Sequence, residues 1–478
     1  MAADDPTSQD AATLPSPEQV VVILKKEFTR TEQTYEVLSL EQTEKDGKPS
    51  FVLRRSSYAE NNKGLQDLWD EFGITHPPVH LQPGSQRRLH VIVSTNSGTG
   101  LSTQVYENVL APLLETFGLT AATSDEPEQG SYHLLITQNA ESVKEFSKDF
   151  TVRHQGEANV EHTIVLLSGD GGVIDLLNGY ASSTESADST TNLPIIAILP
   201  LGTGNALFHS LHKRVKSPPT TTNLVQGLRT LLRGKAAPLP SFKVTFPEGS
   251  RTITYSETSE PASTGIYSTT DSISSLGEQT EYVTHLYGVV VASYGFHSQL
   301  VWESDTPEYR KHGAQRFHMV AEQLLKEGHA YRATVEIGRS SSTTADEASF
   351  EKLDRDEHAY ILATPVSNLE KTFCISPASE PLDGQLRLVH FGPVDGAKTM
   401  EIMMAAYDGG KHIGIDGVGY EEINELRITT HEEDARWRKI CIDGTIVEIP
   451  AGGRIVVSKE ARRHLKVLAD GSTSNNAS

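Results

Sequence analysis

The sequence predicts an α/β domain followed by a mainly β sandwich domain, and two observations carry this prediction. Between residues 86 and 216, four apolar runs each lead into a stretch of helical spacing, and strands that alternate with helices indicate a largely parallel sheet. Between residues 217 and 458, short β-like runs follow one another with turn residues between them, which is typical of a mainly β domain.

Four buried strands are expected in the first domain, each marked by a short apolar run. These runs are Leu89–Val93, Tyr132–Ile136, Thr163–Leu167 and Ile195–Leu199. A helix is expected after each of them. The four helices are expected at Val105–Phe117, at Ala140–Phe150, after Gly172 through Tyr180, and after Asn205 through Lys213.

The second domain is expected to contain many short strands. The β-like runs are Phe242–Phe246, Tyr287–Phe296, Ala333–Ile337, Ala359–Val366, Gly384–Phe391, Glu425–Thr430, Lys439–Gly444 and Arg454–Ser458. Two helices are expected beside these runs. The first, Asn223–Arg233, precedes them, and the second, Arg310–Lys326, lies among them.

The remaining segments are interpreted from their composition. Residues 1–18 are polar and contain Pro, which predicts a disordered tail. Residues 19–85 predict a small appended β element with a linker, and residues 459–478 a C-terminal segment and tail. Residues 247–281 are rich in Ser and Thr, so we expect a disordered surface insertion there.

Charge and cysteine content exclude several classes of protein. The chain has 42 Lys and Arg against 63 Asp and Glu, a net charge of −21, so nucleic-acid binding through a basic surface is not expected. Two cysteines are too few for a disulfide-rich fold or a cysteine-rich zinc site. No apolar run approaches the roughly 18 residues that span a bilayer, and the first residues do not resemble a signal peptide. We therefore expect a cytoplasmic protein.

Three glycine-rich loops share one design, in which an apolar strand leads through a glycine turn into a helix. They are Ser94–Gly100, Ser168–Gly172 and Pro200–Asn205. Glycine allows close approach of a ligand to the backbone, and N–H groups at a helix start attract phosphate. In an open α/β sheet such loops gather at the carboxyl ends of the strands. The loops predict a phosphate site, with tight structural turns as the alternative. None of them fits the dinucleotide or Walker A pattern.

Asp170 stands between Gly169 and Gly171 in the middle loop. A carboxylate at a phosphate-binding bend repels phosphate unless a cation or a proton transfer makes use of it. Phosphoryl transfer needs both, because Mg²⁺ accompanies the phosphates and a base orients the attacking hydroxyl. The alternative is that Asp170 caps the helix expected after Gly172.

Taken together, the motifs resemble the catalytic domain shared by diacylglycerol kinases, sphingosine kinases and ceramide kinases. Residues 168–171 (SGDG) resemble the family's GGDG pattern, in the serine form of sphingosine kinases. Residues 199–207 are similar to P-x-G-[ST]-G-N-[AD], and residues 309–317 to the Y-R-x-x-G-x-x-R-F helix. Residues 442–444 match the start of I-D-G-E. The resemblance covers about residues 87–465.

The chain departs from the family pattern at two places in these motifs. Ser94 and Thr95 stand where the first loop of the family has Asn-Pro, and Thr445 stands where Glu is usual after I-D-G.

The resemblance implies an NAD-kinase-like fold and an ATP-dependent lipid kinase with Mg²⁺. Asp170 is implied to be the catalytic carboxylate. The implied nucleotide-binding residues are Ser94, Asn96, Ser97, Gly98, Thr137, Ser168, Gly169, Gly171, Thr203, Gly204, Asn205, Arg310, Arg316 and Asp443. Asp443 is also implied to hold Mg²⁺. The same resemblance implies a lipid substrate at a membrane surface, with peripheral contact.

The lipid-recognition stretch is implied to include Phe296, Gln299 and Val301. Sphingosine kinases have Asp at the last two positions, and one of these pairs with the lipid ammonium. Glu303 or Asp305 could restore that pairing. We expect a sphingoid base as the substrate, because the motif set is most similar to those kinases. Diacylglycerol or ceramide is the alternative lipid, and a non-catalytic nucleotide- or lipid-binding protein is the alternative function.

Overall fold

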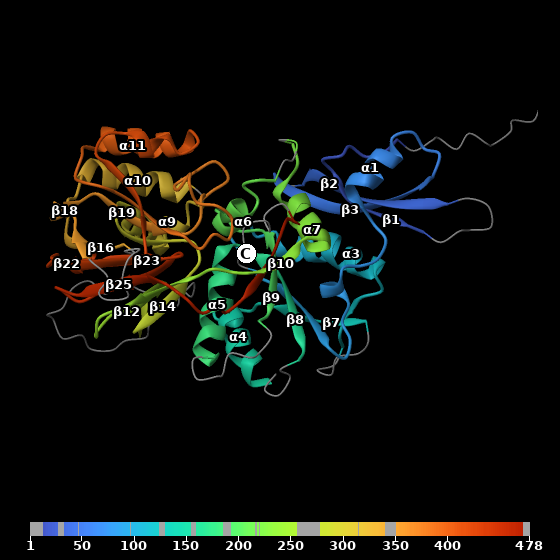
Figure 1. Ribbon diagram of the computed structural model, residues 1–478, viewed down its shortest axis with the longest axis horizontal. Coiled ribbons are helices and arrows are strands. Elements are labelled where there is room, and N and C mark those ends of the chain that lie inside the picture. The colour runs from blue at the N-terminus through green and yellow to red at the C-terminus, as the bar shows by residue number, and fades with distance from the viewer. Residues whose placement is uncertain are drawn as a thin grey trace, which may run out of the picture.

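The computed structural model describes residues 13–471, apart from several internal segments. Those segments are residues 27–32, 46, 96, 124–129, 154–158, 185–192, 216–217, 219, 256–277, 314 and 340–349. The described residues form four sheets, arranged along the length of the molecule (Figure 1). The predicted tail at residues 1–18 lies mostly outside the described residues, and so do most of the Ser/Thr-rich insertion and the last residues of the chain.

The N-terminal sheet has four strands in the order β3-β2-β1-β4. The strands are β1 (Val20–Lys25), β2 (Thr34–Lys45), β3 (Lys48–Ala59) and β4 (Gly73–Ile74). Helix α1 (Leu65–Phe72) buries Leu65, Leu68 and Phe72 against this sheet. A short 3₁₀ turn, η1 (Val79–Leu81), connects it to the next domain. The sheet lies in the range where the sequence predicts a small β element.

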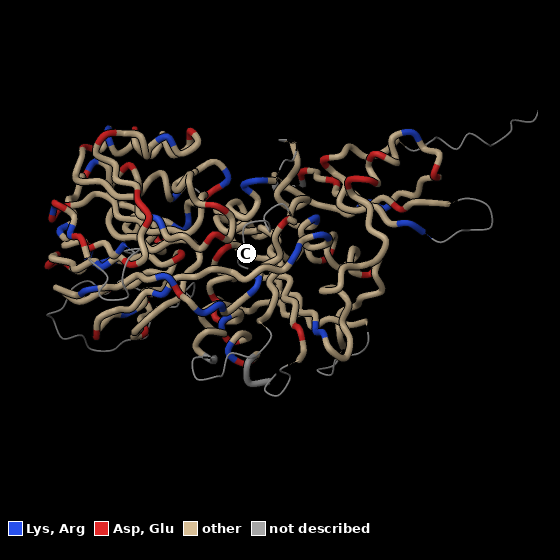
Figure 2. The backbone as a smooth tube through the Cα atoms, viewed as in Figure 1, with Lys and Arg blue, Asp and Glu red and all other residues tan. Residues whose placement is uncertain are grey.

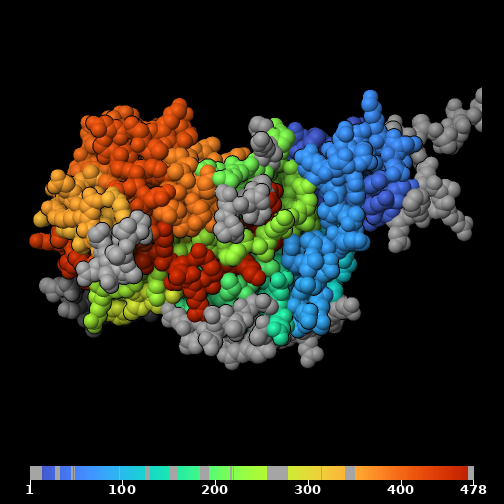
Figure 3. Space-filling view, viewed as in Figure 1, coloured from blue at the N-terminus to red at the C-terminus, as the bar shows by residue number. Residues whose placement is uncertain are grey.

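The second sheet is the largely parallel one that the sequence predicts. Its order is β10-β26-β9-β8-β5-β7-β6, and only the β10–β26 pair is antiparallel. The strands are β5 (Arg87–Val93), β6 (Thr120–Ala121), β7 (Ser131–Ile136), β8 (Glu161–Ser168), β9 (Ile195–Pro200), β10 (Lys235–Pro238) and β26 (Lys466–Ala469). The last two lie outside residues 86–216, so the chain returns to complete this sheet near its end. Figure 3 shows the red C-terminal residues lying beside green and teal residues of this domain.

Helices flank the parallel sheet, as the sequence predicts. They are α2 (Ser102–Val105), α3 (Ala111–Thr116), α4 (Ser142–Arg153), α5 (Asp170–Thr184), α6 (Ala206–Leu211) and α7 (Asn223–Arg233). A π-helical turn, η2 (Tyr106–Leu110), joins α2 to α3. Pro112 follows this turn and has no N–H to donate, which disfavours regular α-helical bonding there. The boundaries differ from the prediction by a few residues at most ends; for example, α5 begins at Asp170 and α6 ends at Leu211.

Two antiparallel sheets make up the second half of the molecule, and apolar side chains from both form one core between them. The first contains β11 (Phe242–Thr245), β14 (His285–Gly288), β16 (Tyr331–Gly338), β17 (Phe350–Lys352), β18 (Glu357–His358), β22 (Glu425–Thr430) and β25 (Arg454–Lys459). The second contains β12 (Arg251–Tyr255), β13 (Glu278–Tyr282), β15 (Ala292–Gly295), β19 (Tyr360–Thr364), β20 (Leu386–Phe391), β21 (Val418–Ile423), β23 (Lys439–Ile442) and β24 (Thr445–Glu448).

The second half also contains the helices α8 (Phe296–Ser304), α9 (Pro307–Arg310), α10 (Gln315–Glu327) and α11 (Gly396–Tyr407), with 3₁₀ turns η3 (Lys411–Gly414) and η4 (Ala435–Trp437). Helices α10 and α11 lie above these sheets in the view of Figure 1. No helix among the described residues is long and apolar enough to cross a bilayer. Acidic and basic residues are interspersed through both halves of the molecule (Figure 2).

Three expectations about the second half are wrong in detail. The single helix expected at Arg310–Lys326 is two helices, because Gly313 has a left-handed φ of 56° between them. The run Tyr287–Phe296 is two strands, β14 and β15, separated by Val289–Val291. The ends of the 247–281 insertion are ordered as β12 and β13, while residues 256–277 lie outside the described residues.

Candidate active site

The three glycine-rich loops meet at the carboxyl ends of β5, β8 and β9, which are neighbours in the parallel sheet. The backbone N–H of Leu201, in the third loop, donates to the carbonyl of Ser168 in the second loop (3.0 Å). The Ser97 hydroxyl, in the first loop, donates to the carbonyl of Leu201 (2.8 Å). The expected gathering of the loops is therefore confirmed, because hydrogen bonds join the third loop to the other two.

Close backbone contact explains several of the glycines in these loops. A Cβ on Gly202 would lie 2.4 Å from the Cα of Gly169, and a Cβ on Gly98 would lie 2.3 Å from the Thr203 hydroxyl oxygen. A side chain at either position would push the loops apart. Gly171 is different, because a Cβ there would meet no atom within 4 Å. Gly100, at the end of the first loop, has the same open space, and Gly171 is the open position next to Asp170.

Asp170 is the first residue of α5, yet its carboxylate binds the start of a different helix. Its oxygens accept the backbone N–H groups of Ala206 (2.8 Å) and Leu207 (3.0 Å) in the first turn of α6. The alternative that Asp170 caps the helix after Gly172 is therefore wrong, because its side chain caps α6 instead. Burial raises the pKa of Asp170, and the two N–H bonds oppose that shift. Each carboxylate oxygen keeps a further lone pair, so a substrate hydroxyl could still donate to it.

Asp443 lies in the turn between β23 and β24, with a left-handed φ of 49°. Its oxygens accept the backbone N–H groups of Val289 (2.6 Å), Val290 (3.0 Å) and Val291. Burial raises the pKa of Asp443 to about 7, and the nearby Asp170 carboxylate adds to this rise. Asp443 is thus electrostatically coupled to Asp170 and anchors the segment that separates β14 from β15.

The role of Asp443 as a Mg²⁺ ligand stays a prediction. Three N–H donors already occupy its carboxylate. Within the described part of the chain, no group of three or more His, Cys, Asp or Glu side chains could hold a metal ion. The described residues therefore form no metal site with three or more such ligands.

Other predicted nucleotide residues hold the loops in shape. Asn205 has a left-handed φ of 54°, and its side-chain amide bonds both the N–H (2.9 Å) and the carbonyl (2.8 Å) of Gly202. The Thr137 hydroxyl accepts the N–H of Thr95 (3.0 Å) and so fixes the first loop. The Ser94 N–H donates to the carbonyl of Leu167 (3.1 Å). Asn96 lies outside the described residues.

Gly204 brings the third loop against the second half of the molecule. A Cβ on Gly204 would lie 3.0 Å from the carbonyl oxygen of Leu369. Nearby, the Ser210 hydroxyl of α6 accepts the N–H of Asn368 (3.1 Å). The loop that carries the predicted nucleotide residues is thus fixed by residues of both halves.

Arg310 and Arg316 share one acidic partner, Asp305. Arg310 makes two bonds to the Asp305 carboxylate (3.1 and 2.7 Å) and a third to the carbonyl of Tyr255 (3.1 Å). Arg316 approaches the same carboxylate only at 3.8 Å, and its Nε is buried without a hydrogen-bond partner. Arg316 therefore has more donor capacity left for a phosphate than Arg310.

The β12–β24 register relates the arginines to the Asp443 turn. Ile253 pairs with Ile446, so continuing the antiparallel register by two residues places Tyr255 at the level of Gly444. Because Arg310 binds the carbonyl of Tyr255, it lies at the end of β12, next to this strand pair.

The predicted lipid residues do not meet in one cavity. Gln299 is fully buried, and its amide donates to Glu303 (2.6 Å). Val301 packs with an apolar cluster under β12, whereas Phe296 packs against two other cores and borders a pocket between α10 and α11. The role of these three residues in lipid binding stays a prediction, and in the described arrangement they contact different clusters.

Glu303 and Asp305, the two acids that could pair with a lipid amine, both have partners in the structure. Glu303 accepts two bonds from the Arg436 guanidinium (3.0 and 2.9 Å), besides the bond from Gln299. Asp305 is bound by Arg310 and approached by Arg316. Both carboxylates already have cationic partners.

Asn178, on α5, connects the two halves of the molecule. Its amide oxygen accepts the N–H of Tyr287 (2.9 Å), and its amide nitrogen donates to the carbonyl of the same residue (2.9 Å). Tyr287 belongs to β14, directly before the valines that hold Asp443. Asn178 therefore joins α5, which begins at Asp170, to the strand that leads into the segment bound by Asp443.

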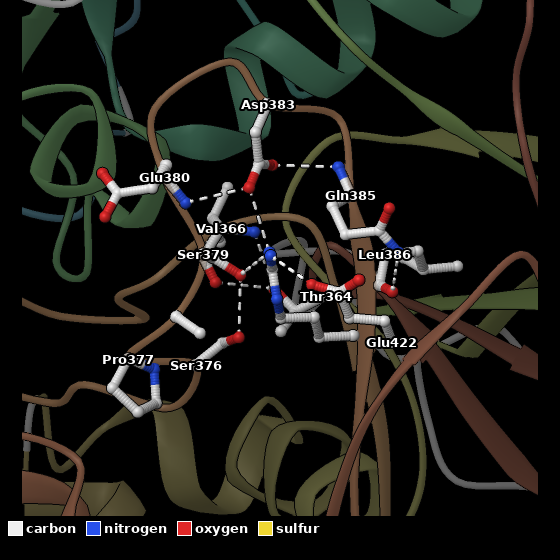
Figure 4. A network of polar contacts seen from close by, with 12 residues as sticks. Thr364, Val366, Ser376, Pro377, Ser379, Glu380, Asp383, Gln385, Leu386 and Glu422 are labelled. Atoms are coloured by element: carbon white, nitrogen blue, oxygen red, sulfur yellow. Dashed lines mark hydrogen bonds and ion pairs between the residues drawn. The ribbon is translucent and has the colours of Figure 1, made fainter. Parts of the chain in front are cut away.

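A polar network fastens the second half to the end of α6. Asp383 accepts the N–H groups of Glu380 (3.1 Å) and Gln385 (2.9 Å) (Figure 4). Arg387 binds Asp383, Ser379 and Glu422. Lys213, which follows α6, donates to the carbonyls of Pro377 (2.7 Å) and Ser379 (2.8 Å). The Asp383 turn is thus part of the contact between the two halves.

Comparisons with known proteins agree with the nucleotide loops. Residues 88–238 match the family model of the diacylglycerol kinase catalytic domain. No curated protein matches the chain. A solved structure of a diacylglycerol kinase from Bacillus anthracis str. Sterne is 13% identical, with coverage of 82% of this chain and 100% of that chain and a TM-score of 0.45. Another structure from that organism, described as a diacylglycerol kinase, is 14% identical, with coverage of 82% and 98% and a TM-score of 0.47.

The matched segment contains all three loops and Asp170. The family match supports a lipid kinase, an enzyme that transfers phosphate, and the family implies the use of ATP.

Proposed function

We propose that this chain transfers the γ-phosphate of ATP to the primary hydroxyl of a neutral membrane lipid such as diacylglycerol. The observation that carries the proposal is the position of Asp170 where the three loops meet, beside the open space at Gly171. We also propose that this domain has an NAD-kinase-like fold. This part of the proposal rests on the motifs alone.

In the proposed reaction the lipid hydroxyl donates its proton to Asp170 as its oxygen attacks the γ-phosphorus. A bond forms between the hydroxyl oxygen and phosphorus, the bond to the ADP oxygen breaks, and ADP leaves with that electron pair. The raised pKa of Asp170 makes its carboxylate a better proton acceptor than an exposed Asp. N–H groups at the start of α5 and the Arg316 guanidinium would stabilise the phosphates.

The preference for a neutral lipid departs from the sphingoid base that the motif set favours. An ammonium group held in a pocket without an acidic partner is costly. Gln299 and Val301 carry no charge, and Glu303 and Asp305 are engaged with arginines. A hydroxyl headgroup needs only a hydrogen bond, so a neutral lipid fits these residues better.

A lipid panel tests the proposal. Purified protein is given ATP, Mg²⁺ and mixed micelles of diacylglycerol, ceramide or sphingosine, with Asp170→Asn measured in parallel. We expect diacylglycerol or ceramide to be phosphorylated at least about tenfold faster than sphingosine, with the activity lost in the variant. Preference for sphingosine would overturn the choice of lipid. Absence of turnover with every lipid would favour the non-catalytic alternative.

A further inference from the structure

Helix α11 has apolar side chains on both of its faces. Its inner side is buried in a core through Thr399, Ile402 and Ala406. Its outer side carries Met400, Met404 and Tyr407, whose exposed fractions are 36%, 56% and 42%. A surface helix ordinarily has polar residues on its outer side, and a helix that is apolar all round is ordinarily covered.

The three exposed residues form one face, because positions i, i+4 and i+7 lie above one another on a helix. We refer to Met400, Met404 and Tyr407 as the α11 face. The only charged side chains of this helix, Lys398 and Glu401, bind each other (2.8 Å). The face is therefore apolar and carries no uncompensated charge of its own.

Helix α11 borders a pocket together with a predicted lipid residue. A pocket between α10 and α11 is lined by Phe296, Leu324, Val394 and Thr399, among others. Val394, which precedes the helix, is itself 38% exposed. Figure 1 shows α11 lying outermost, above α10, at the edge of the molecule. The pocket that reaches Phe296 therefore lies on the inner side of α11, and the α11 face lies on the outer side of the same helix.

We propose that the α11 face docks on a lipid bilayer and inserts Met400, Met404 and Tyr407 among the acyl chains. The inference rests on the proposed function, since a lipid kinase must reach a hydroxyl at the bilayer surface. Methionine is flexible and polarisable, so it adapts to an irregular apolar partner such as acyl chains. Exposed apolar patches of this kind mark interaction surfaces.

The charge of the molecule indicates how the docking would be driven. The net charge is −21, so attraction to anionic lipids by charge is not expected. Burial of apolar area remains as the driving force, and it is not screened by salt. The full chain is expected to bind phosphatidylcholine vesicles, with the same affinity in about 0.1 M and about 0.5 M salt.

The test replaces Met400 and Met404 together by Ser. Tyr407 is left unchanged, because its ring contacts Phe373 and its hydroxyl contacts Glu370. The matched control is Val79→Ser, an equally exposed apolar residue (54%) in the turn before β5. Loss of two inserted side chains should weaken binding to phosphatidylcholine vesicles by roughly tenfold or more, with the control unchanged. Equal melting temperatures would confirm that the variants are folded.

Several results would overturn the docking. These are absence of vesicle binding by the unaltered chain, unchanged binding by the double variant, or binding that falls steeply with salt. Light scattering could also overturn it. If the unaltered chain is a dimer and the double variant is a monomer, the α11 face joins two copies of the chain instead.

Vesicle binding and lipid phosphorylation are measured separately, so failure of the kinase proposal can be distinguished from failure of the docking proposal. Vesicle binding that depends on Met400 and Met404, with no lipid phosphorylated, would support docking and refute the kinase. If both proposals are correct, the double variant loses activity on long-chain lipid in vesicles and keeps it on a short-chain lipid dissolved in water.

Discussion

An oxygen of the Asp170 carboxylate lies 2.8 Å from the backbone nitrogen of Ala206, the first residue of α6. This contact ties the second glycine loop to the helix that follows the third. The residue proposed to accept the substrate proton is therefore also a helix cap. The position of the carboxylate is fixed by backbone donors, which do not depend on a side-chain conformation.

Asp170→Asn tests the base. The amide has almost the same shape but cannot accept the proton, so kcat should fall by roughly 10²–10⁴-fold. One amide position can no longer accept an N–H of α6, so a small fall in the melting temperature is also expected. The control is Asp175→Asn on the same helix, which should keep most of the activity. If Asp170→Asn retains more than about a tenth of the turnover, Asp170 is not the base.

The parallel sheet and its three loops could be predicted because their signals are local. An apolar run, a glycine turn and a helical repeat lie next to one another in the chain at each loop. The donors that hold the two acidic residues carry no such signal. Asp170 is held by Ala206 and Leu207, and Asp443 by the valines at 289–291, in every case through backbone N–H groups of distant residues.

Elements missed by the sequence analysis lack the usual periodicity. Helix α11 is apolar on both faces, so no alternation of polar and apolar sides marks it. Strand β13 is exposed at all five positions and has no buried face to reveal it. The pairing of Glu303 with Arg436 joins residues 133 positions apart, and no pattern near either residue predicts it.

Gly171→Ala probes the open space beside Asp170. A Cβ there meets no protein atom within 4 Å, and alanine suits a helix better than glycine. We expect unchanged or slightly higher stability together with an ATP KM raised several-fold, because a bound nucleotide would meet the new methyl group. Gly414→Ala, equally open but in η3, should alter neither property. An unchanged KM in Gly171→Ala would argue that no nucleotide approaches this position.

Gly202→Ala tests a glycine that, unlike Gly171, has no free space beside it. Its Cβ would lie 2.4 Å from the Cα of Gly169, so the second and third loops would have to separate. We expect lower thermal stability and weaker ATP binding together, measured by thermal denaturation and calorimetry. A stable variant with normal ATP affinity would contradict the close packing of the loops.

Arg316 and Arg310 should respond differently to truncation. Arg316 keeps its Nε without a partner, so Arg316→Ala should raise the ATP KM by roughly tenfold with little loss of stability. Arg310 holds both Asp305 and the Tyr255 carbonyl, so Arg310→Ala should lower the melting temperature. Lipid binding measured without ATP should be normal for Arg316→Ala. Equal effects of the two variants on KM and on stability would refute this division of roles.

The pH dependence of stability should reveal Asp175. Burial raises the pKa of Asp175 to about 7, the nearby Glu141 adds to the rise, and Lys144 opposes it. The folded chain therefore holds this proton up to about pH 7, whereas the unfolded chain releases it near pH 4. Asp175 accordingly lowers the free energy of unfolding as pH rises through this window, and its contribution is constant above it.

Asp175→Asn removes this ionisation. Relative to the unaltered chain, the variant should gain on the order of 1 kcal/mol or more in free energy of unfolding between pH 5 and pH 8. Urea denaturation at both pH values measures the difference, and contributions from Asp170 and Asp443 cancel because both proteins contain them. Asp67→Asn, on the exposed side of α1, should show no such change. A stability difference for Asp175→Asn that is the same at pH 5 and pH 8 would mean that Asp175 does not titrate in this window.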